Sequence, residues 1–189
     1  MEDASELSAA DARKFFEENY PLLNQDQHRA FVTIKQLIEK STSSSTTDDG
    51  ELIFLDSPGG TGKTFTLNVL VSWIRMQGRE VASSATSGIA ATLLFLGRTS
   101  HNRFKFPIPV HEDSICNINK QSDLAKYLLE MALGIVDEGP MLDRLYYETL
   151  DRTMRDFAEK SDKGKKFGGK IILVSGDFRQ LLPVIPRAN

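Results

Sequence analysis

The sequence lacks three features that would place it in a specialised class of protein. It has a single cysteine, Cys116, so an internal disulfide cannot form and a reducing compartment fits. No apolar run approaches the roughly 18 residues of a membrane-spanning helix. The acidic N-terminus "MEDASELSAADARKFF" has no apolar core of a secretory signal. We therefore expect a protein without a membrane span, a secretory signal or a disulfide framework.

The chain also lacks an excess of positive charge. Its 23 lysines and arginines against 26 acidic residues give a net charge of −3, whereas a globally basic chain would indicate nucleic-acid binding. Any such binding must therefore come from a local groove, because a field depends on where the charges lie. Of its 189 residues, 40% are hydrophobic and 26% are charged. This is the composition of an ordinary globular domain with a sizeable core.

Strand-like and helix-like segments alternate along the chain. The stretches 51–56, 79–85, 131–139 and 170–177 are predicted as strands, the first and last of them buried, and the stretches 24–40, 63–78, 87–97 and 141–160 as helices. The polar stretch 41–50 and the basic, glycine-rich stretch 159–170 are predicted as loops. Apolar strands that alternate with helices indicate an α/β fold with a parallel sheet covered on both faces.

The sequence "SPGGTGKT" (57–64) stands between the first predicted strand and the helix 63–78. It matches the phosphate-loop pattern G-x-x-x-x-G-K-[ST] except at its first position, Ser57. The glycines let successive backbone N–H groups face an anion, and the helix adds the positive end of its dipole. Lys63 can reach the β- and γ-phosphates, and Thr64 can offer a hydroxyl to Mg²⁺. Serine is strained at position 57 if a positive φ is needed there. The alternative is a glycine-rich turn with a solvated lysine.

An acidic pair, Asp137 and Glu138, ends the predicted strand 131–139. Parallel sheets bind ligands at the carboxyl ends of their strands, so this pair is placed to face the phosphate loop. One carboxylate can hold Mg²⁺ through water, and the other can orient and deprotonate an attacking water. The alternative is a solvated pair at a helix start, where acids are favoured.

The stretch "LVSGDFRQLLPVIP" carries a third group of polar residues after a strand. Gln180 is an uncharged donor that can touch a γ-phosphate or the attacking water, which suits a sensor because Glu138 already supplies a base. Asp177 can brace the loop, and Arg179 can pair with phosphate or with an acid. The alternative is a capped loop punctuated by prolines.

The segment "GRTSHNRFKFPIP" (97–109), called here the basic-aromatic strip, interleaves cations with rings. The cations are Arg98, Arg103 and Lys105, and the rings are His101, Phe104 and Phe106. Cations bind a nucleic-acid backbone and rings stack on bases, so the strip is a candidate for single-stranded nucleic acid, with Thr99 and His101 as leading contacts. The alternative is an exposed hairpin whose phenylalanines are turned to the core.

Six motifs together resemble one family. "LNQDQ", "SPGGTGKT", "SSATSGIAATLL", "GRTSHNRFK", "VDEGPM" and "GDFRQLLPVIP" occur in the order of the motifs of the Pif (petite integration frequency) family of superfamily-one DNA helicases, with Helitron-type transposon helicases the nearest in character. The resemblance covers about Leu23 to Pro186. It implies an ATP-dependent DNA helicase whose residues 23–189 form a RecA-like P-loop NTPase domain after an N-terminal extension, 1–22.

The resemblance also implies a role for each matching residue. The catalytic residues would be Lys63, Glu138 and Gln180, and the Mg²⁺ ligands Thr64 and Asp137. The ATP-binding residues would be Gln27, Pro58, Gly59, Gly60, Thr61, Gly62, Lys63, Thr64 and Phe65. Gln27 would pair with the adenine edge, with Gln25 as the second candidate. Single-stranded DNA would be contacted by Thr86, Ser87, Thr99, His101, Arg103 and Phe104.

The family implies two RecA-like domains, the second of which supplies an arginine finger. We therefore expect this chain to be the first motor domain of a larger helicase, monomeric and weakly active by itself. Its partners would be single-stranded DNA and the second domain. A nuclear or mitochondrial location and a role in DNA repair, recombination or telomere maintenance are implied in the same way.

Two other functions stay open. A P-loop phosphotransferase or GTPase shares the phosphate loop, although the sequence contains no guanine-reading N/T-K-x-D element. A transposon-derived P-loop domain that only binds nucleic acid or protein is the other alternative. Ser57 and the missing second domain are the observations that keep this second alternative open.

Overall fold

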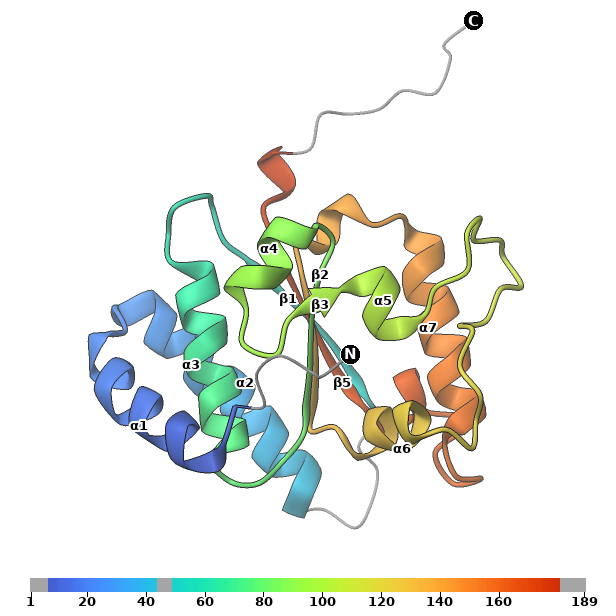
Figure 1. The fold of residues 1–189 in the computed structure, drawn as a ribbon, viewed down its shortest axis with the longest axis horizontal. Helices are drawn as coiled ribbons and strands as arrows, with labels where there is room; N and C mark the ends of the chain where they lie inside the picture. Colours follow the sequence, from blue (N-terminus) through green and yellow to red (C-terminus); the bar gives the residue numbers. More distant parts are fainter. Residues whose placement is uncertain (1–6, 44–48, 181–189) are drawn as a thin grey trace, which may run out of the picture.

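The described strands form one parallel sheet. The computed structural model describes residues 7–43 and 49–180, and the strand order of its five-stranded sheet is β1-β5-β4-β2-β3. The strands are β1 (Glu51–Asp56), β2 (Val81–Ala85), β3 (Arg98–Thr99), β4 (Leu133–Asp137) and β5 (Ile171–Gly176), and all their pairings are parallel (Figure 1). The predicted parallel α/β fold is confirmed. The carboxyl ends of the strands meet at one edge of the sheet, where the predicted functional motifs begin.

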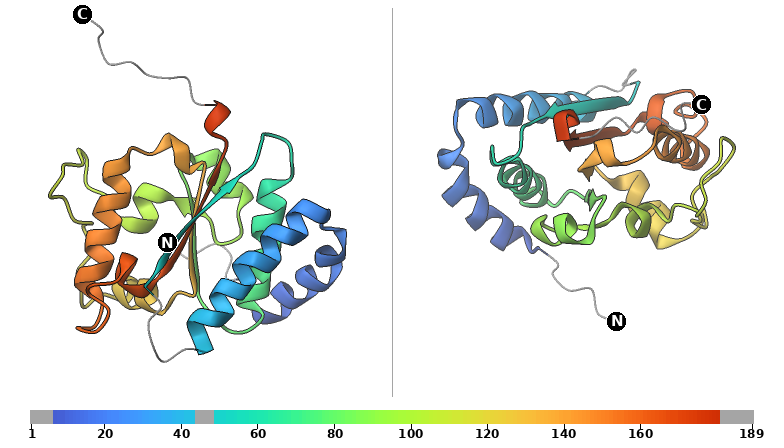
Figure 2. Two further views of the ribbon diagram at one scale, coloured as in Figure 1. Left: turned by 180° about the vertical axis from the view of Figure 1, so that it is seen from behind. Right: turned by 90° about the horizontal axis from the view of Figure 1, so that it is seen from above.

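Helices cover both faces of this sheet. The α-helices are α1 (Ala9–Asn19), α2 (Gln25–Ser43), α3 (Lys63–Arg75), α4 (Gly88–Leu93), α5 (Ser100–Phe104), α6 (Asp123–Glu130) and α7 (Arg144–Phe157). The short 3-10 helices are η1 (Tyr20–Leu22), η2 (Gly139–Met141), η3 (Lys166–Gly169) and η4 (Phe178–Gln180). Figures 1 and 2 show α1, α2 and α3 on one side of the sheet and α6 and α7 on the other. Within the described ranges, no helix has both the length and the apolar character that crossing a bilayer requires.

Each layer of helices has its own apolar cluster against the sheet. Phe31 of α2 and Leu67 of α3 belong to a buried cluster that includes Ile135 of β4. Leu128 of α6 and Leu150 of α7 belong to a second cluster, which packs on the opposite face. Burying this apolar surface on both faces is the main favourable term in the stability of the domain. The two clusters therefore fix the sheet that positions the motifs.

The edge strand β1 is less buried than the strands beside it. All residues of β2, β4 and β5 are buried, including Ser175 and Gly176 at the polar end of β5. β1 pairs with β5 alone among the described residues, and its Leu52 and Phe54 are 49% and 39% exposed. The strand predicted over 51–56 is confirmed with the same bounds, but the prediction that it is buried is wrong. An apolar run alone does not separate an edge strand from an inner one.

The predicted helices are present, with shifted ends. The predicted helix 87–97 ends at Leu93, because the backbone of Leu94 is extended. The predicted helix 141–160 begins at Arg144, where the Asp143 carboxylate accepts a hydrogen bond from the N–H of Leu145 at 2.8 Å and caps the first turn.

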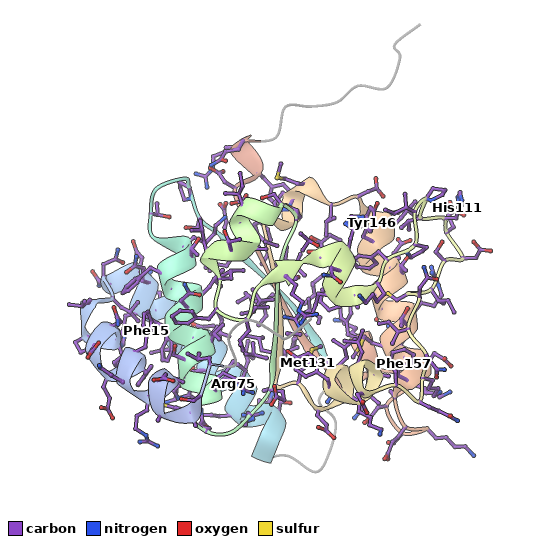
Figure 3. All side chains as sticks on the ribbon, in the orientation of Figure 1. Phe15, Arg75, His111, Met131, Tyr146 and Phe157 are labelled. Carbon is purple, nitrogen blue, oxygen red and sulfur yellow. The ribbon has the colours of Figure 1, made fainter. Side chains whose placement is uncertain are left out.

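The described part of the predicted N-terminal extension packs on the domain. Phe16 of α1 and Tyr20 of η1 place their rings 5.9 and 5.1 Å from the ring of Phe31 in α2. Phe15, labelled in Figure 3, meets Phe95 edge to face, with the ring centroids 4.7 Å apart. Leu7, Phe15, Phe16 and Tyr20 therefore pack against the apolar cluster of the domain, and residues 1–6 lie outside the described ranges.

Candidate functional site

The loop between β1 and α3 has the backbone of a phosphate-binding turn. Gly60 and Gly62 have φ values of 78° and 79°, which glycine adopts without steric cost. The backbone N–H and the hydroxyl of Thr61 both donate to the Pro58 carbonyl, at 3.4 and 2.7 Å, and close the turn. Ser57 is not among the described residues with positive φ, and its hydroxyl bonds that of Thr61. The serine therefore fits this turn without backbone strain.

Lys63, the first residue of α3, is held between two carboxylates. Its Nζ lies 2.8 Å from Glu138 Oε1 and 3.1 Å from Asp137 Oδ1. Burial lowers the pKa of Lys63, but the hydrogen bonds and charges of Glu138 and Asp137 outweigh it and raise that pKa above its ordinary value. The lysine therefore stays charged. The structure brings the predicted phosphate-binding lysine and the predicted acidic pair into one ion-pair cluster.

Asp137 is the most constrained member of this cluster. Its side chain is 2% exposed, and its Oδ1 accepts hydrogen bonds from Ser175 Oγ at 2.7 Å and from the N–H of Glu138 at 2.9 Å. Ser175 comes from β5, so the neighbouring strand fixes the orientation of the carboxylate. Ser175 is not among the site residues that the motifs predicted. The signal was available, because Ser175 is a hydroxyl at the end of the apolar run "KIILVS".

Gln27 joins the start of α2 to the phosphate loop. The Asn24 carboxamide accepts from the N–H of Gln27, and Gln27 Oε1 accepts from the N–H of Asn24, each at 3.0 Å, which is a reciprocal capping arrangement. Gln27 Nε2 donates to the Thr61 carbonyl at 2.9 Å. A Cβ on Gly62 would lie 2.5 Å from the same nitrogen, and the φ of 79° at this position favours glycine. Gln25, the second candidate for adenine pairing, is exposed in the first turn of α2.

Gln180 lies against the other side of the same loop. A Cβ on Gly59 would come within 2.8 Å of Gln180 Nε2, which itself donates to Asp177 Oδ2 at 3.1 Å. Asp177 Oδ1 accepts from the backbone and the side chain of Arg179, and Arg179 also pairs with Asp56 at 2.8 Å. Asp177 therefore braces this turn as predicted, and Arg179 pairs with acids. Residues 181–186 of this motif lie outside the described ranges.

A cavity of about 400 Å³ opens beside the loop. Its lining includes Asn24, Gln27, Ser57, Pro58, Thr61 and Lys63. Its volume falls within the range of small-molecule sites. Thr64 and Phe65 are half-buried in the first turn of α3, and Phe65 packs against the apolar cluster shared by α2 and α3. The predicted ATP-binding residues thus lie in or next to one loop, which borders one cavity.

Two of the predicted DNA contacts in the basic-aromatic strip belong to the interior. Phe104 is 0% exposed, and Arg103, 8% exposed, donates to the carbonyls of Ser83 and Leu96 while its guanidinium lies 5.6 Å from the ring of Tyr127. A buried ring cannot stack on a base, and a buried guanidinium with these partners cannot bind a phosphate. The predictions of DNA contact for Arg103 and Phe104 are therefore wrong in this structure.

The cause of this error is local. The segment forms α5 rather than a hairpin, and residues three and four positions after Ser100, which is itself buried, face the sheet with it. Phe106 is also buried, at 7% exposure. The alternative prediction is thus confirmed for the two phenylalanines, which are turned to the core, but not for the exposed hairpin.

The other predicted DNA contacts stay near the surface, at the carboxyl edge of the sheet. Thr99 caps α5 and Ser87 caps α4 through their hydroxyls, and Thr86 directly follows β2. Ala85 of β2 is paired with Thr99 of β3, which places these segments side by side. His101 Nε2 lies 3.3 Å from the hydroxyl of Tyr146, which Figure 3 labels on α7. Their contacts with DNA stay predictions.

A parallel sheet whose phosphate loop faces an acidic pair on another strand defines a RecA-like P-loop NTPase domain. The chain belongs to the PIF1-like helicase family, whose family model matches residues 22–189. It is 32% identical over 154 residues to the ATP-dependent DNA helicase Pif1 of a Psychrobacter species, covering 80% of this chain and 23% of that protein. The family and the fold that the motifs predicted are confirmed.

Solved Pif1 structures have the same fold. A Pif1 helicase solved for a study of DNA unwinding at forked DNA by two coordinating Pif1 helicases matches with a TM-score of 0.65 and 27% identity, over 87% of this chain and 36% of that one. The Bacteroides Pif1 helicase in complex with ADP-AlF3 and single-stranded DNA matches with a TM-score of 0.57 and 30% identity, over 79% of this chain and 33% of that one. The chain thus spans about a quarter to a third of the length of these three proteins.

Proposed function

We propose that this chain is the ATP-binding motor domain of a longer DNA helicase that couples ATP hydrolysis to translocation on single-stranded DNA and duplex unwinding. The observation that carries the proposal is the convergence of Lys63, Asp137, Glu138 and Gln180 on one phosphate loop beside a cavity. The Psychrobacter relative is an ATP-dependent DNA helicase, and the Bacteroides structure contains a nucleotide analogue and single-stranded DNA.

Triphosphate binding would use the loop amides and Lys63. The turns at Gly60 and Gly62 and the start of α3 provide N–H donors for an anion. Lys63 would exchange its contacts with Asp137 and Glu138 for phosphate oxygens, and this exchange would free both acids. Gln27 would reach adenine by giving up one of its present amide bonds, to Thr61 or to Asn24.

The donor set near Lys63 fits Mg²⁺. The Thr64 hydroxyl and the Asp137 carboxylate are hard oxygen ligands, and Mg²⁺ is commonly bound by one or two carboxylates together with phosphates and water. The described residues contain no cluster of three or more His, Cys, Asp or Glu that could hold a metal without a nucleotide. Bound Mg²⁺ would neutralise charge on the phosphates. A magnesium site that forms only with nucleotide is therefore the arrangement we propose.

Hydrolysis would depend on the two acids in different ways. Asp137, locked by Ser175, would hold the metal-binding position, and Glu138, whose side chain is 34% exposed, would accept the proton of the attacking water. Gln180 would sense the γ-phosphate from its place beside Gly59. The half-buried and exposed residues Thr86, Ser87, Thr99 and His101 at the same edge of the sheet would contact single-stranded DNA.

A second RecA-like domain would complete the site. This domain would supply the arginine finger that stabilises the transferring phosphoryl group. The proposal is supported by the length of the relatives, of which this chain spans 23% to 36% in the comparisons above. We propose that the chain by itself binds nucleotide and hydrolyses it slowly.

The deciding experiment measures ATP hydrolysis by the longer protein with and without single-stranded DNA. We expect DNA to stimulate the rate, and Lys63→Ala to abolish most of the stimulated rate. Lys126→Ala, an exposed lysine of α6 paired with Asp123, is the matched control and should behave as the parent protein. A rate indifferent to DNA would favour a phosphotransferase, and a rate indifferent to Lys63→Ala would favour a domain that only binds.

We also propose that the helicase acts in the nucleus or the mitochondrion, in DNA repair, recombination or telomere maintenance. This proposal follows the family resemblance. A fluorescently tagged protein viewed in its native cells tests the location, and exclusion from both compartments would overturn it.

A further inference from the structure

The segment that follows β2 is hydrogen-bonded to the acidic pair. The N–H of Thr86 donates to the Asp137 carbonyl at 3.1 Å, which continues the pairing with β4 one residue beyond the end of β2. The hydroxyl of Thr86 donates to the Glu138 carbonyl at 3.2 Å and lies 3.6 Å from Met141 Sδ. Thr86 therefore contacts the backbone of both acids, although the sequence assigns it to a different motif.

The backbone of Glu138 needs this support. Glu138 has φ 53° and ψ 32°, a left-handed conformation that residues with a Cβ rarely adopt. Such conformations persist only where the surroundings hold them, and they concentrate at functional sites. Three bonds hold this one: the N–H of Glu138 donates to Asp137 Oδ1, and its carbonyl accepts from the Thr86 hydroxyl and from the N–H of Met141 at 3.0 Å. In this conformation the Glu138 carboxylate reaches Lys63.

Thr86 also stands next to the surface assigned to DNA. It is half-buried, whereas the next three residues, Ser87 to Ile89, are exposed, and Ile89 is 81% exposed. Among the bonds that hold Glu138, the one from Thr86 is the one that arrives from this surface. A shift of the segment that begins at Thr86 would therefore move the backbone of Glu138 directly, without involving a side chain of the phosphate loop.

We propose that Thr86 is a positioning residue for Glu138. Its hydroxyl fixes the left-handed backbone from which the carboxylate is aimed, and it ties the segment that contacts DNA to the residue that activates water. The inference rests on the proposed function, because it gives a route by which single-stranded DNA stimulates hydrolysis. It changes the expected role of Thr86 from a contact of DNA alone to a link between the DNA surface and the acidic pair.

Kinetics of the longer protein separate the two roles of Thr86. Thr86→Val removes the hydroxyl, and Thr86→Ser retains it. We expect Thr86→Val to lower kcat at saturating single-stranded DNA by roughly ten- to a hundredfold, because small misplacements of a reacting group are costly. The KM for ATP and the DNA concentration for half-maximal rate should change by less than about twofold, and Thr86→Ser should restore kcat. A loss that more DNA recovers, or an unchanged kcat, would overturn the inference.

Hydrogen exchange on this chain tests the same bond without any catalysis. We expect Thr86→Val to speed exchange of the amides from Glu138 to Leu142 by roughly two- to tenfold, the factor that loss of one hydrogen bond allows. Thr86→Ser should leave their exchange unchanged. Thr33→Val is the matched control, because its hydroxyl also donates to a carbonyl, that of Arg29 at 2.9 Å, but on α2.

The two measurements fail independently. If DNA does not stimulate hydrolysis by the parent protein, the proposed function fails, and the exchange data still decide whether Thr86 holds Glu138. If exchange from Glu138 to Leu142 is the same in Thr86→Val and in the parent chain, the positioning role is overturned, whatever the hydrolysis rates show.

Discussion

The phosphate loop and the basic-aromatic strip are both rich in residues typical of function, yet the structure treats them differently. Around the loop, residues from four separate motifs converge: Lys63 donates to Glu138, Gln27 donates to the Thr61 carbonyl, and Gln180 lies against Gly59. In the strip, Arg103 and Phe104 are withdrawn into the core. Residue types alone therefore do not distinguish a binding surface from a packed interior.

The two motifs differ in whether they depend on backbone conformation or on side-chain orientation. The phosphate loop is defined by its backbone: a strand, glycines at positions with positive φ, and a helix that begins at Lys63. The strip depends on which way its side chains point, and a single helical turn decides that. Once Thr99 caps α5, Arg103 and Phe104 face the sheet and His101 does not. Substitutions on the two sides of this comparison should have different effects.

Phe104→Ala should give the largest effect, and the effect should be on stability. The ring is fully buried and packs beside Phe106, with centroids 5.7 Å apart, so its truncation should lower the free energy of unfolding by roughly 3–5 kcal/mol. Denaturant unfolding of this chain measures the loss. Ile108→Ala in the same strip, at a residue 81% exposed, should cost less than about 0.5 kcal/mol. Equal costs at the two positions would contradict the buried assignment.

Arg103→Ala should come next. The guanidinium satisfies the carbonyls of Ser83 and Leu96, and removal of a charged donor from buried acceptors should cost roughly 2–3 kcal/mol of unfolding free energy. Arg29→Ala on α2, whose side chain is 72% exposed, is the matched control and should be nearly neutral. If Arg103→Ala instead left stability intact and weakened binding of single-stranded DNA, the original assignment of this residue would be restored.

Lys63→Ala should act on ligand binding. Loss of one charged donor to the triphosphate should weaken binding of a fluorescent ATP analogue by roughly ten- to a hundredfold, or about 1.4–2.8 kcal/mol. The measurement is a fluorescence titration of this chain with Mg²⁺ present, and Lys126→Ala should leave the affinity unchanged. Unaltered affinity in Lys63→Ala would mean that the loop does not bind the triphosphate.

These contrasts show how much the sequence could predict. The parallel fold, the phosphate loop and the placing of Asp137 and Glu138 at a strand end follow from apolar runs and motif spacing. The exposure of β1 does not, because it depends on which strands lie beside it. Neither do the links from Ser175 to Asp137 and from Thr86 to Glu138, since each joins residues whose proximity is set by strand order.

His101→Ala should have the smallest effect. Of the three rings in the strip, that of His101 is half-buried, whereas those of Phe104 and Phe106 are buried. One edge of the imidazole already contacts Tyr146, with ring centroids 5.0 Å apart, so only part of the ring is left for a base. Stacking of one base on a ring contributes about 1–3 kcal/mol, and we expect the lower limit here, a loss of about fivefold in affinity for single-stranded DNA. Fluorescence anisotropy with a labelled oligonucleotide measures it, and Ile108→Ala is again the control. If His101→Ala and the parent protein bound DNA equally, no ring of the strip would contact DNA, and Thr86, Ser87 and Thr99 would remain as the proposed contacts.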